Sequence, residues 1–95
     1  MAEVVYSEAA LIDLERLTEF LLDEFPAEAL ETIHLITGAI ELLKDHPLIG
    51  RPLENELHEL VISRGRSGYL AMYSFEEAHD IVLVLRIRHQ REAGY

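Results

Sequence analysis

The sequence predicts an α+β fold in which two helices pack on one antiparallel sheet. Apolar residues recur at helical spacing from about residue 8 to residue 45. After residue 52 the period changes to two, which is typical of strands. Residues 46–52 separate these halves and contain two prolines and a glycine, so neither periodicity continues through them. The expected order is β-α-α-β-β-β, in a single domain that spans residues 1–95.

The first helix is expected from about Glu8 to Phe25, after a short β-prone segment at residues 4–6. Ser7 suits the N-cap position, because its hydroxyl can accept a hydrogen bond from a free backbone N–H. Apolar side chains at spacings of three and four predict one buried stripe, with the acidic residues elsewhere. The stripe consists of Ala10, Leu11, Leu14, Leu17, Leu21 and Leu22, and the acids outside it are Asp13, Glu15 and Glu19.

A second helix is expected from Pro26 to about Asp45, because proline is well tolerated at the first helical position. The short connection predicts an antiparallel helix hairpin. Gly38 costs about 1 kcal/mol relative to alanine inside a helix, so it either permits a close helix approach or is simply tolerated. The apolar positions of this helix are Ala29, Leu30, Ile33, Ile36, Ile40 and Leu43.

Three strands are expected in the second half. Residues 57–64 and 69–75 form a hairpin around the turn 65–68, and a polar turn at residues 76–80 leads to the run 81–85. This last run is apolar at every position, which predicts a central strand that is covered on both faces. Three aromatic residues share one face of the middle strand, where core packing competes with base stacking as their role: Tyr69, Tyr73 and Phe75.

The composition is that of an ordinary globular protein, with 49% hydrophobic and 27% charged residues and a net charge of −10. The charge is uneven, because residues 1–47 carry about −9 and residues 48–95 about −1. Acidic helices that face solvent explain this division, and such a field disfavours binding to many phosphates. Cysteine is absent, and no signal peptide or apolar run of roughly 20 residues is found, so we expect a cytoplasmic protein that binds no membrane.

The last fifteen residues concentrate the cations of this acidic chain. An apolar run passes into Arg86, Arg88, His89, Arg91 and the terminal Tyr95, and with Arg66 these residues form the predicted effector surface. Arg86 and Arg88 share a face by strand alternation, so pairing with the acidic helices is an equally good explanation. The five histidines show no i,i+3 or i,i+4 pairs, so neither a metal site nor a cofactor is expected.

Several short motifs, in this order and spacing, resemble the RelE/ParE superfamily of small bacterial toxins. They are Tyr6-Ser7, Pro47 with Gly50-Arg51-Pro52, Gly68-Tyr69, Tyr73 and the closing residues 88–95. The closing octet resembles the branch often called plasmid stabilization proteins. The resemblance covers nearly the whole chain and implies the toxin of a type II toxin–antitoxin pair, neutralised by a cognate antitoxin protein.

The resemblance leaves two activities and a third alternative. ParE-like members inhibit DNA gyrase without hydrolytic chemistry, whereas RelE-like members cut mRNA on the ribosome; the third alternative is a non-toxic binding module of the same fold. A metal-independent ribonuclease needs cations and an acid–base pair, for which the candidates are Arg64, Arg88, His89 and Tyr95. Leu70, His58 and Ser74 occupy positions where relatives often have arginine, and we expect this to remove cations from the sheet face where cleavage would occur. We therefore expect a ParE-like toxin that binds gyrase and makes no sequence-specific contact with DNA by itself.

Overall fold

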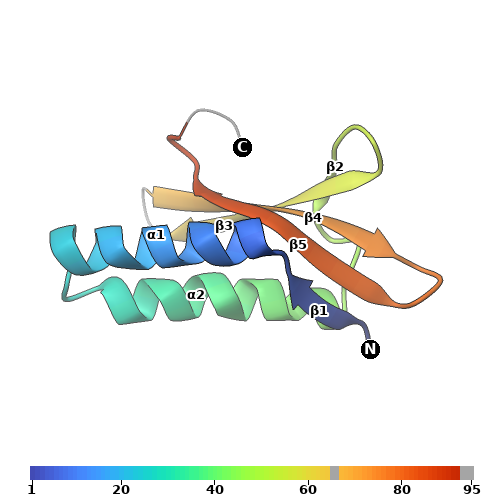
Figure 1. Ribbon diagram of the computed structural model, residues 1–95, viewed down its shortest axis with the longest axis horizontal. Coiled ribbons are helices and arrows are strands. Elements are labelled where there is room, and N and C mark those ends of the chain that lie inside the picture. Colours follow the sequence, from blue (N-terminus) through green and yellow to red (C-terminus); the bar gives the residue numbers. More distant parts are fainter. Residues whose placement is uncertain (65–66, 93–95) are drawn as a thin grey trace.

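The fold was analysed in a computed structural model, which describes residues 1–64 and 67–92. Gly65, Arg66 and residues 93–95 lie outside the described part, and with them the tip of the predicted turn, the effector candidate Arg66 and the terminal Tyr95. Two helices cover one face of a twisted sheet, as Figure 1 shows. The elements are β1 (Glu3–Tyr6), α1 (Glu8–Glu24), α2 (Ala29–Glu41), the 3₁₀ turn η1 (Leu42–Lys44), β2 (Arg51–Pro52), β3 (Leu57–Arg64), β4 (Ser67–Glu76) and β5 (Ile81–His89).

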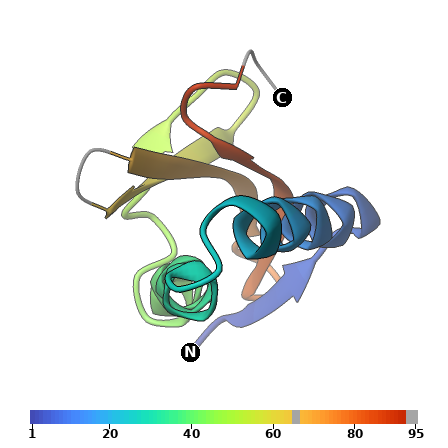
Figure 2. The same ribbon diagram turned by 90° about the vertical axis from the view of Figure 1, so that its left-hand side faces the viewer.

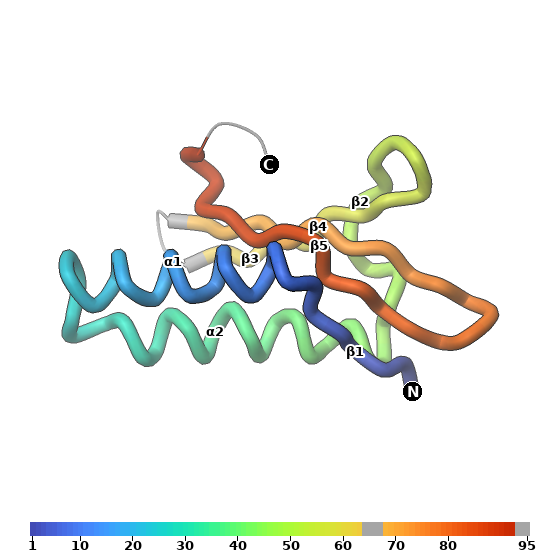
Figure 3. The backbone as a smooth tube through the Cα atoms, in the orientation of Figure 1, coloured from blue at the N-terminus to red at the C-terminus, as the bar shows by residue number. Residues whose placement is uncertain are grey.

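The five strands form one sheet in the order β1-β5-β4-β3-β2. The α+β class is confirmed, and β5 lies inside the sheet between β1 and β4. The expectation that this strand is covered on both faces is wrong, because its alternate residues Ile81, Leu83 and Leu85 are only partly buried. The sheet is mixed rather than wholly antiparallel, because β1 runs parallel to β5 in the register Glu3↔Ile81 to Tyr6↔Val84. The helix hairpin lies between β1 and the remaining strands along the chain, so β1 is free to pair in parallel with the last of them (Figure 3). The short strand β2 was not predicted, since Pro52 obscures its pattern.

The helix hairpin differs from prediction at its turn. The Ser7 hydroxyl accepts a hydrogen bond from the backbone N–H of Ala10 (3.0 Å), so the predicted N-cap is confirmed. Pro26 lies in the turn after α1, and α2 begins only at Ala29, so the predicted start of the second helix is wrong. The chain first closes a turn in which the N–H of Glu28 bonds to the carbonyl of Phe25 (3.1 Å). Gly38 has open space where a Cβ would stand, so it permits no close approach within this chain.

The core consists of side chains between two layers, and the end-on view in Figure 2 shows how the helices lie against the sheet. Its fully buried side chains include Ile36, Ile40, Leu43, Tyr73, Val82, Val84 and Ile87. The predicted stripe on α1 is narrower than expected, because Leu11 and Leu22 are more than half exposed. Asp13, predicted outside the stripe, is instead buried with 3% exposure, and Leu30 of α2 is 69% exposed.

The side chain of Tyr73 explains why residue 50, after the helices, is a glycine. The tyrosine is fully buried, and its hydroxyl accepts the backbone N–H of Gly50 at 2.9 Å. A Cβ at residue 50 would come within 2.7 Å of the ring and its oxygen, so only glycine fits there. Tyr69 is also buried and Phe75 partly so, and the core alternative for these aromatic residues is confirmed.

In the described part of the chain, neither helix has the length and apolar character that a bilayer crossing requires.

Candidate functional site

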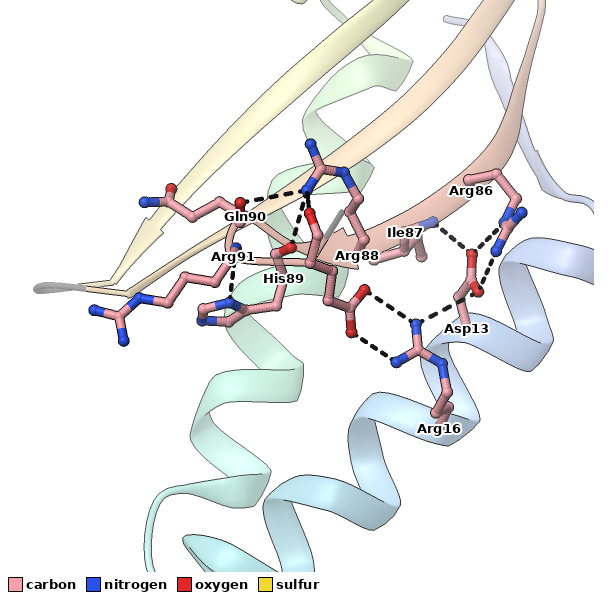
Figure 4. A network of polar contacts seen from close by, with 9 residues as sticks. Asp13, Arg16, Arg86, Ile87, Arg88, His89, Gln90 and Arg91 are labelled. Atoms are coloured by element: carbon pink, nitrogen blue, oxygen red, sulfur yellow. Dashed lines mark hydrogen bonds and ion pairs between the residues drawn. The ribbon is translucent and has the colours of Figure 1, made fainter. Parts of the chain in front are cut away.

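The second half of β5 is held to α1 by a buried carboxylate (Figure 4). Asp13 accepts two hydrogen bonds from the Arg86 guanidinium, from Nε at 2.7 Å and from Nη2 at 3.1 Å. It also accepts the backbone N–H of Ile87 at 2.9 Å. Because β1 pairs with β5 only as far as Val84, this N–H faces the helix rather than a strand. Asp13 therefore supplies the acceptor that a neighbouring strand would otherwise provide.

Asp13 is ionised in this position. Burial would raise the pKa of its carboxyl group, but the hydrogen bonds from Arg86 and Ile87, together with the charges of Arg86 and Arg16, outweigh burial and hold the pKa below its usual range. Nearby, the hydroxyl of Ser7 donates to the carbonyl of Leu85 at 2.9 Å. Ser7 and Asp13 thus form hydrogen bonds with the part of the β5 backbone that β1 does not reach.

A second set of contacts orders the residues that follow β5. The Arg16 guanidinium bonds to both carboxylate oxygens of Glu92, at 2.7 and 3.3 Å, and this bond holds the pKa of Glu92 below its usual range. Arg88 donates to three backbone carbonyls, those of His89 (3.2 Å), Gln90 (3.3 Å) and Glu92. The turn that ends the described chain is therefore fixed from both sides (Figure 4).

The predicted effector residues divide into two groups. Arg86 and Arg88 are engaged within the fold, and Arg86 is paired with an acidic helix as the alternative explanation proposed. His89 and Arg91 reach the surface at the end of β5. The His89 ring stands edge-on to Tyr69, with centroids 5.2 Å apart, and its Nδ1 accepts the backbone N–H of Arg91 at 3.1 Å. This bond places the proton of the neutral ring on Nε2. For Arg64 the structure gives only the backbone, which pairs with Ser67 at the end of β3.

A groove lies between the end of α1 and the end of β5. It encloses about 520 Å³, and a smaller hollow of about 170 Å³ adjoins it beside Thr32 of α2. Aromatic rings form its walls and cations its rim. We call it the aromatic groove; it is lined by Arg16, Leu17, Phe20, Phe25, Tyr69, His89, Arg91 and Glu92.

Sequence analysis identified His89 and Arg91 but missed the other half of this groove. Phe20 and Phe25 are each about half exposed, at 52% and 53%. Neither ring belongs to the predicted apolar stripe of α1, and no local pattern indicated that they would line a groove with His89. Arg16 and Asp13 carried no signal, because a lone charge within an acidic helix looks like a solvated residue.

On the face of the sheet that points away from the helices, the side chains that the structure describes include few cations. Across β3, β4 and β5, one row is Glu59, Met72 and Arg86, and the next is Val61, Leu70 and Arg88. Glu59 is itself buried and accepts a hydrogen bond from Nε of Arg51 at 2.8 Å.

The three residues expected at positions where relatives often have arginine do not share one face. Leu70 and Ser74 alternate together on the outer face of β4. His58 stacks on Tyr73, with ring centroids 5.4 Å apart, and so lies toward the helices. The expectation that all three substitutions remove cations from one face is therefore wrong for His58. In residues 1–64 and 67–92, no three His, Asp or Glu side chains gather as a metal site would require.

The sequence profile described as "ParE toxin of type II toxin-antitoxin system, parDE" matches residues 4–94. The chain belongs to this toxin family. It is also 35% identical over 92 residues to Toxin RelE3 of Caulobacter vibrioides, an alignment that covers 97% of this chain and 98% of the relative. The chain is thus a toxin of a type II toxin–antitoxin system, of the RelE/ParE superfamily.

Two solved toxin–antitoxin complexes have similar folds. A chain of the chromosomal ParDE system from P. aeruginosa superimposes with a TM-score of 0.77 at 20% identity, over 94% of this chain and 96% of that chain. A chain of the RelBE2 complex from Mycobacterium tuberculosis gives 0.58 at 26% identity, over 93% and 96%. Two helices on a five-stranded sheet are therefore the shared architecture of the ParE-family toxin and these neighbours.

Proposed function

We propose that this ParE-family toxin stops growth by inhibiting DNA gyrase, and that a cognate antitoxin neutralises it. The observation that carries the proposal is the outer face of the sheet. Glu59, Val61 and Leu70 occupy its centre, where cleavage of RNA would require cations to stabilise the developing phosphorane charge. Arg86 and Arg88 border the same face but are bonded to Asp13 and to backbone carbonyls.

The electrostatic field of the chain supports a protein target as well. A net charge of −10 opposes approach to a polyanion such as the ribosome with its mRNA. The aromatic groove offers what a protein target needs, namely exposed rings beside His89 and Arg91 at the end of β5. We assign the effector surface to this groove and its rim, with Arg86 and Arg88 as residues that hold it in place.

A RelE-like ribonuclease is the second candidate, and one observation favours it. His89 is held in a single tautomer with Nε2–H available, next to the Tyr69 ring, which resembles a positioned acid–base group. In that case Arg64, Arg88, His89 and Tyr95 would be the catalytic candidates. A non-toxic binding module remains the third alternative, and toxicity itself distinguishes it from the first two.

The test is induced expression of the chain with parallel pulse-labelling of DNA and protein synthesis. We expect DNA damage and filamentation while translation initially continues. His89→Ala and Arg91→Ala should each reduce toxicity at unchanged protein level. His79→Ala is the matched control, because His79 is an exposed histidine in the turn before β5, at the opposite end of that strand from His89, and pairs only with Glu76 among the described contacts.

Two results would contradict the gyrase proposal. An early fall in translation that His89→Ala relieves would make the chain a ribonuclease. Absence of toxicity in the wild type, with antitoxin binding intact, would leave only the binding module.

For the antitoxin, we propose docking along the helix hairpin and the adjacent edge of the sheet. The outward surface of the hairpin is acidic, so a partner segment with exposed lysine or arginine is expected. Glu15→Gln with Glu19→Gln should weaken binding to the cognate antitoxin, whereas Glu54→Gln with Glu77→Gln, an equal charge change away from the hairpin, should not. Equal affinity of both double variants would exclude this surface. Asp13, first grouped with these acids, is excluded because it is buried.

A further inference from the structure

The aromatic groove has an apolar part and a cationic part. Phe20 and Phe25 form the apolar part, with ring centroids 6.2 Å apart, and both rings are about half exposed. Tyr69 and His89 line the groove and also the smaller hollow beside α2, so the two spaces meet at the end of β5. An occupant can therefore place a large apolar side chain beside the phenylalanine rings and a polar group at the end of the strand.

The two arginines of the groove differ in their contacts. The Arg16 guanidinium bonds to both carboxylate oxygens of Glu92 and lies 3.8 Å from a carboxylate oxygen of Asp13. The Arg91 side chain extends away from the pair formed by Arg16 and Glu92 (Figure 4), and no group in the described part of the chain bonds to its guanidinium. Because Nδ1 of His89 accepts the backbone N–H of Arg91, Nε2 of the neutral ring carries a second N–H donor at the same end of the groove.

A carboxylate matches these donors, because N–H groups of a cation form their strongest hydrogen bonds with an anion. Glu28, which lines only the smaller hollow, would repel a carboxylate there, so the anion belongs at the end of β5. A nucleic acid fits less well, since its affinity grows with the number of phosphates that cations neutralise, and the chain carries a net charge of −10. The basic segment proposed for the antitoxin suits the acidic helix hairpin and has the wrong charge for this end of the groove.

We propose, on the basis of the proposed function, that the aromatic groove binds a segment of the protein target in which an acidic residue stands next to a large apolar side chain. The apolar side chain packs against Phe20 and Phe25, and the carboxylate accepts hydrogen bonds from Arg91 and from Nε2 of His89. Arg91 is then the residue that distinguishes a carboxylate from an amide of the same shape. Arg16 does not take this role, because Glu92 already occupies its guanidinium.

Two blocked dipeptides of equal size test the proposal, N-acetyl-Glu-Phe-amide and N-acetyl-Gln-Phe-amide. Each is titrated into the isotope-labelled full-length chain, and the shifts of its backbone amide resonances give the site and the affinity. We expect both peptides to shift the resonances of Phe20, Phe25 and His89, and the acidic peptide to bind about fivefold more tightly. Added salt should reduce this preference, because Arg91 is exposed.

Substitutions distinguish the two parts of the groove. Arg91→Gln should abolish the preference for the acidic peptide, and Arg91→Lys should keep part of it. Lys44→Gln is the matched control, because it makes the same change in charge at a residue beyond the end of α2. Phe20→Ala should weaken binding of both peptides alike and leave the preference unchanged. Leu42→Ala, at an apolar residue of nearly equal exposure (54% against 52%), should change neither.

Equal binding of the two peptides would overturn the proposal, as would a preference that Arg91→Gln leaves intact. It is also overturned if a single-stranded oligoribonucleotide shifts the same resonances at a lower concentration than the acidic peptide, since the groove would then belong to a ribonuclease site. The titrations need no gyrase, so their failure is distinct from that of the proposed function, which fails if the wild-type toxin leaves supercoiling uninhibited. If the toxin inhibits gyrase and Arg91→Gln inhibits it equally, the groove does not bind the target and the proposal is overturned.

Discussion

The two halves of β5 are held in place by different interactions. The first half, Ile81 to Val84, pairs in parallel with β1 and buries Val82 and Val84 completely. The second half continues beyond β1, where Asp13 and Ser7 provide the partners of its backbone. Burial of apolar surface stabilises the first half, and hydrogen bonds and ion pairs with α1 order the second. The same strand thus begins as a core element and ends as a polar, surface-forming segment.

This difference bears on the proposed function, because the proposed effector surface lies at the end of the polar half. Arg88, His89 and Arg91 keep their positions only if β5 is held at Ile87 and the turn after it is held at Glu92. A register shift between Met72 and Tyr73 of the neighbouring strand separates the two halves and changes the pairing from Tyr73↔Val84 to Met72↔Arg86. We expect substitutions in the two halves of β5 to differ in how much they change the free energy of unfolding. We also expect that change to depend differently on pH and salt.

The largest effect should come from a charge placed in the apolar half. Val84→Asp buries an unpaired carboxylate among fully buried neighbours and should destabilise the chain by about 4 kcal/mol or more, which is enough to prevent folding. Val61→Asp is the control, because Val61 is 48% exposed and should tolerate the charge. Circular dichroism and urea unfolding distinguish them. Similar stability of both variants would show that the apolar half is not the core element described.

Removal of the buried Asp13 carboxylate should have the second-largest effect on the free energy of unfolding. Asp13→Ala leaves the N–H of Ile87 without its acceptor and Arg86 without its ion pair, so we expect a loss of about 2–3 kcal/mol in the free energy of unfolding. Glu15→Ala, on the exposed side of the same helix, should change it by less than about 0.5 kcal/mol. If the Asp13 and Glu15 variants unfold at the same urea concentration, the polar half does not depend on α1.

The pH dependence of stability should follow the same carboxylate. The pKa of Asp13 is lowered in the folded state, so the unfolded chain binds a proton first as pH falls. The stabilisation is complete above the ordinary carboxyl pKa of about 4 and is lost as pH falls through the lower folded value. Asp13→Asn should therefore flatten the stability profile below about pH 4, as measured by urea unfolding at a series of pH values. A variant profile as steep as that of the wild type would contradict the assignment.

The smallest effect is expected at the end of the described chain. The pair formed by Arg16 and Glu92 is half exposed on the arginine side, so a double-mutant cycle should give a coupling of no more than about 1 kcal/mol, reduced by salt. The same variants should nonetheless lower toxicity, because they release the turn that carries Arg91. A coupling well above this value, unaffected by salt, would mean that the turn is part of the core.

Sequence patterns predicted the apolar half of β5 well and the contacts of its polar half poorly. The continuous apolar run of β5 and the Ser7 cap have local physical causes, so they could be predicted directly from the sequence. The position of Asp13 has no local cause: its role depends on where β1 ends relative to β5, a contact between residues more than seventy positions apart. The aromatic groove depends likewise on Phe20 and Phe25 meeting His89. Arg88 and His89 were both selected from the sequence, yet only the fold separates Arg88, which bonds to backbone carbonyls, from His89, whose ring lines the aromatic groove.

A gyrase supercoiling assay with the purified toxin tests the central claim most directly, with ribosome-dependent mRNA cleavage measured in parallel. The account predicts dose-dependent inhibition of supercoiling that His89→Ala weakens, that His79→Ala leaves unchanged and that the cognate antitoxin abolishes, with mRNA intact. Cleavage of ribosome-bound mRNA with gyrase unaffected would contradict it.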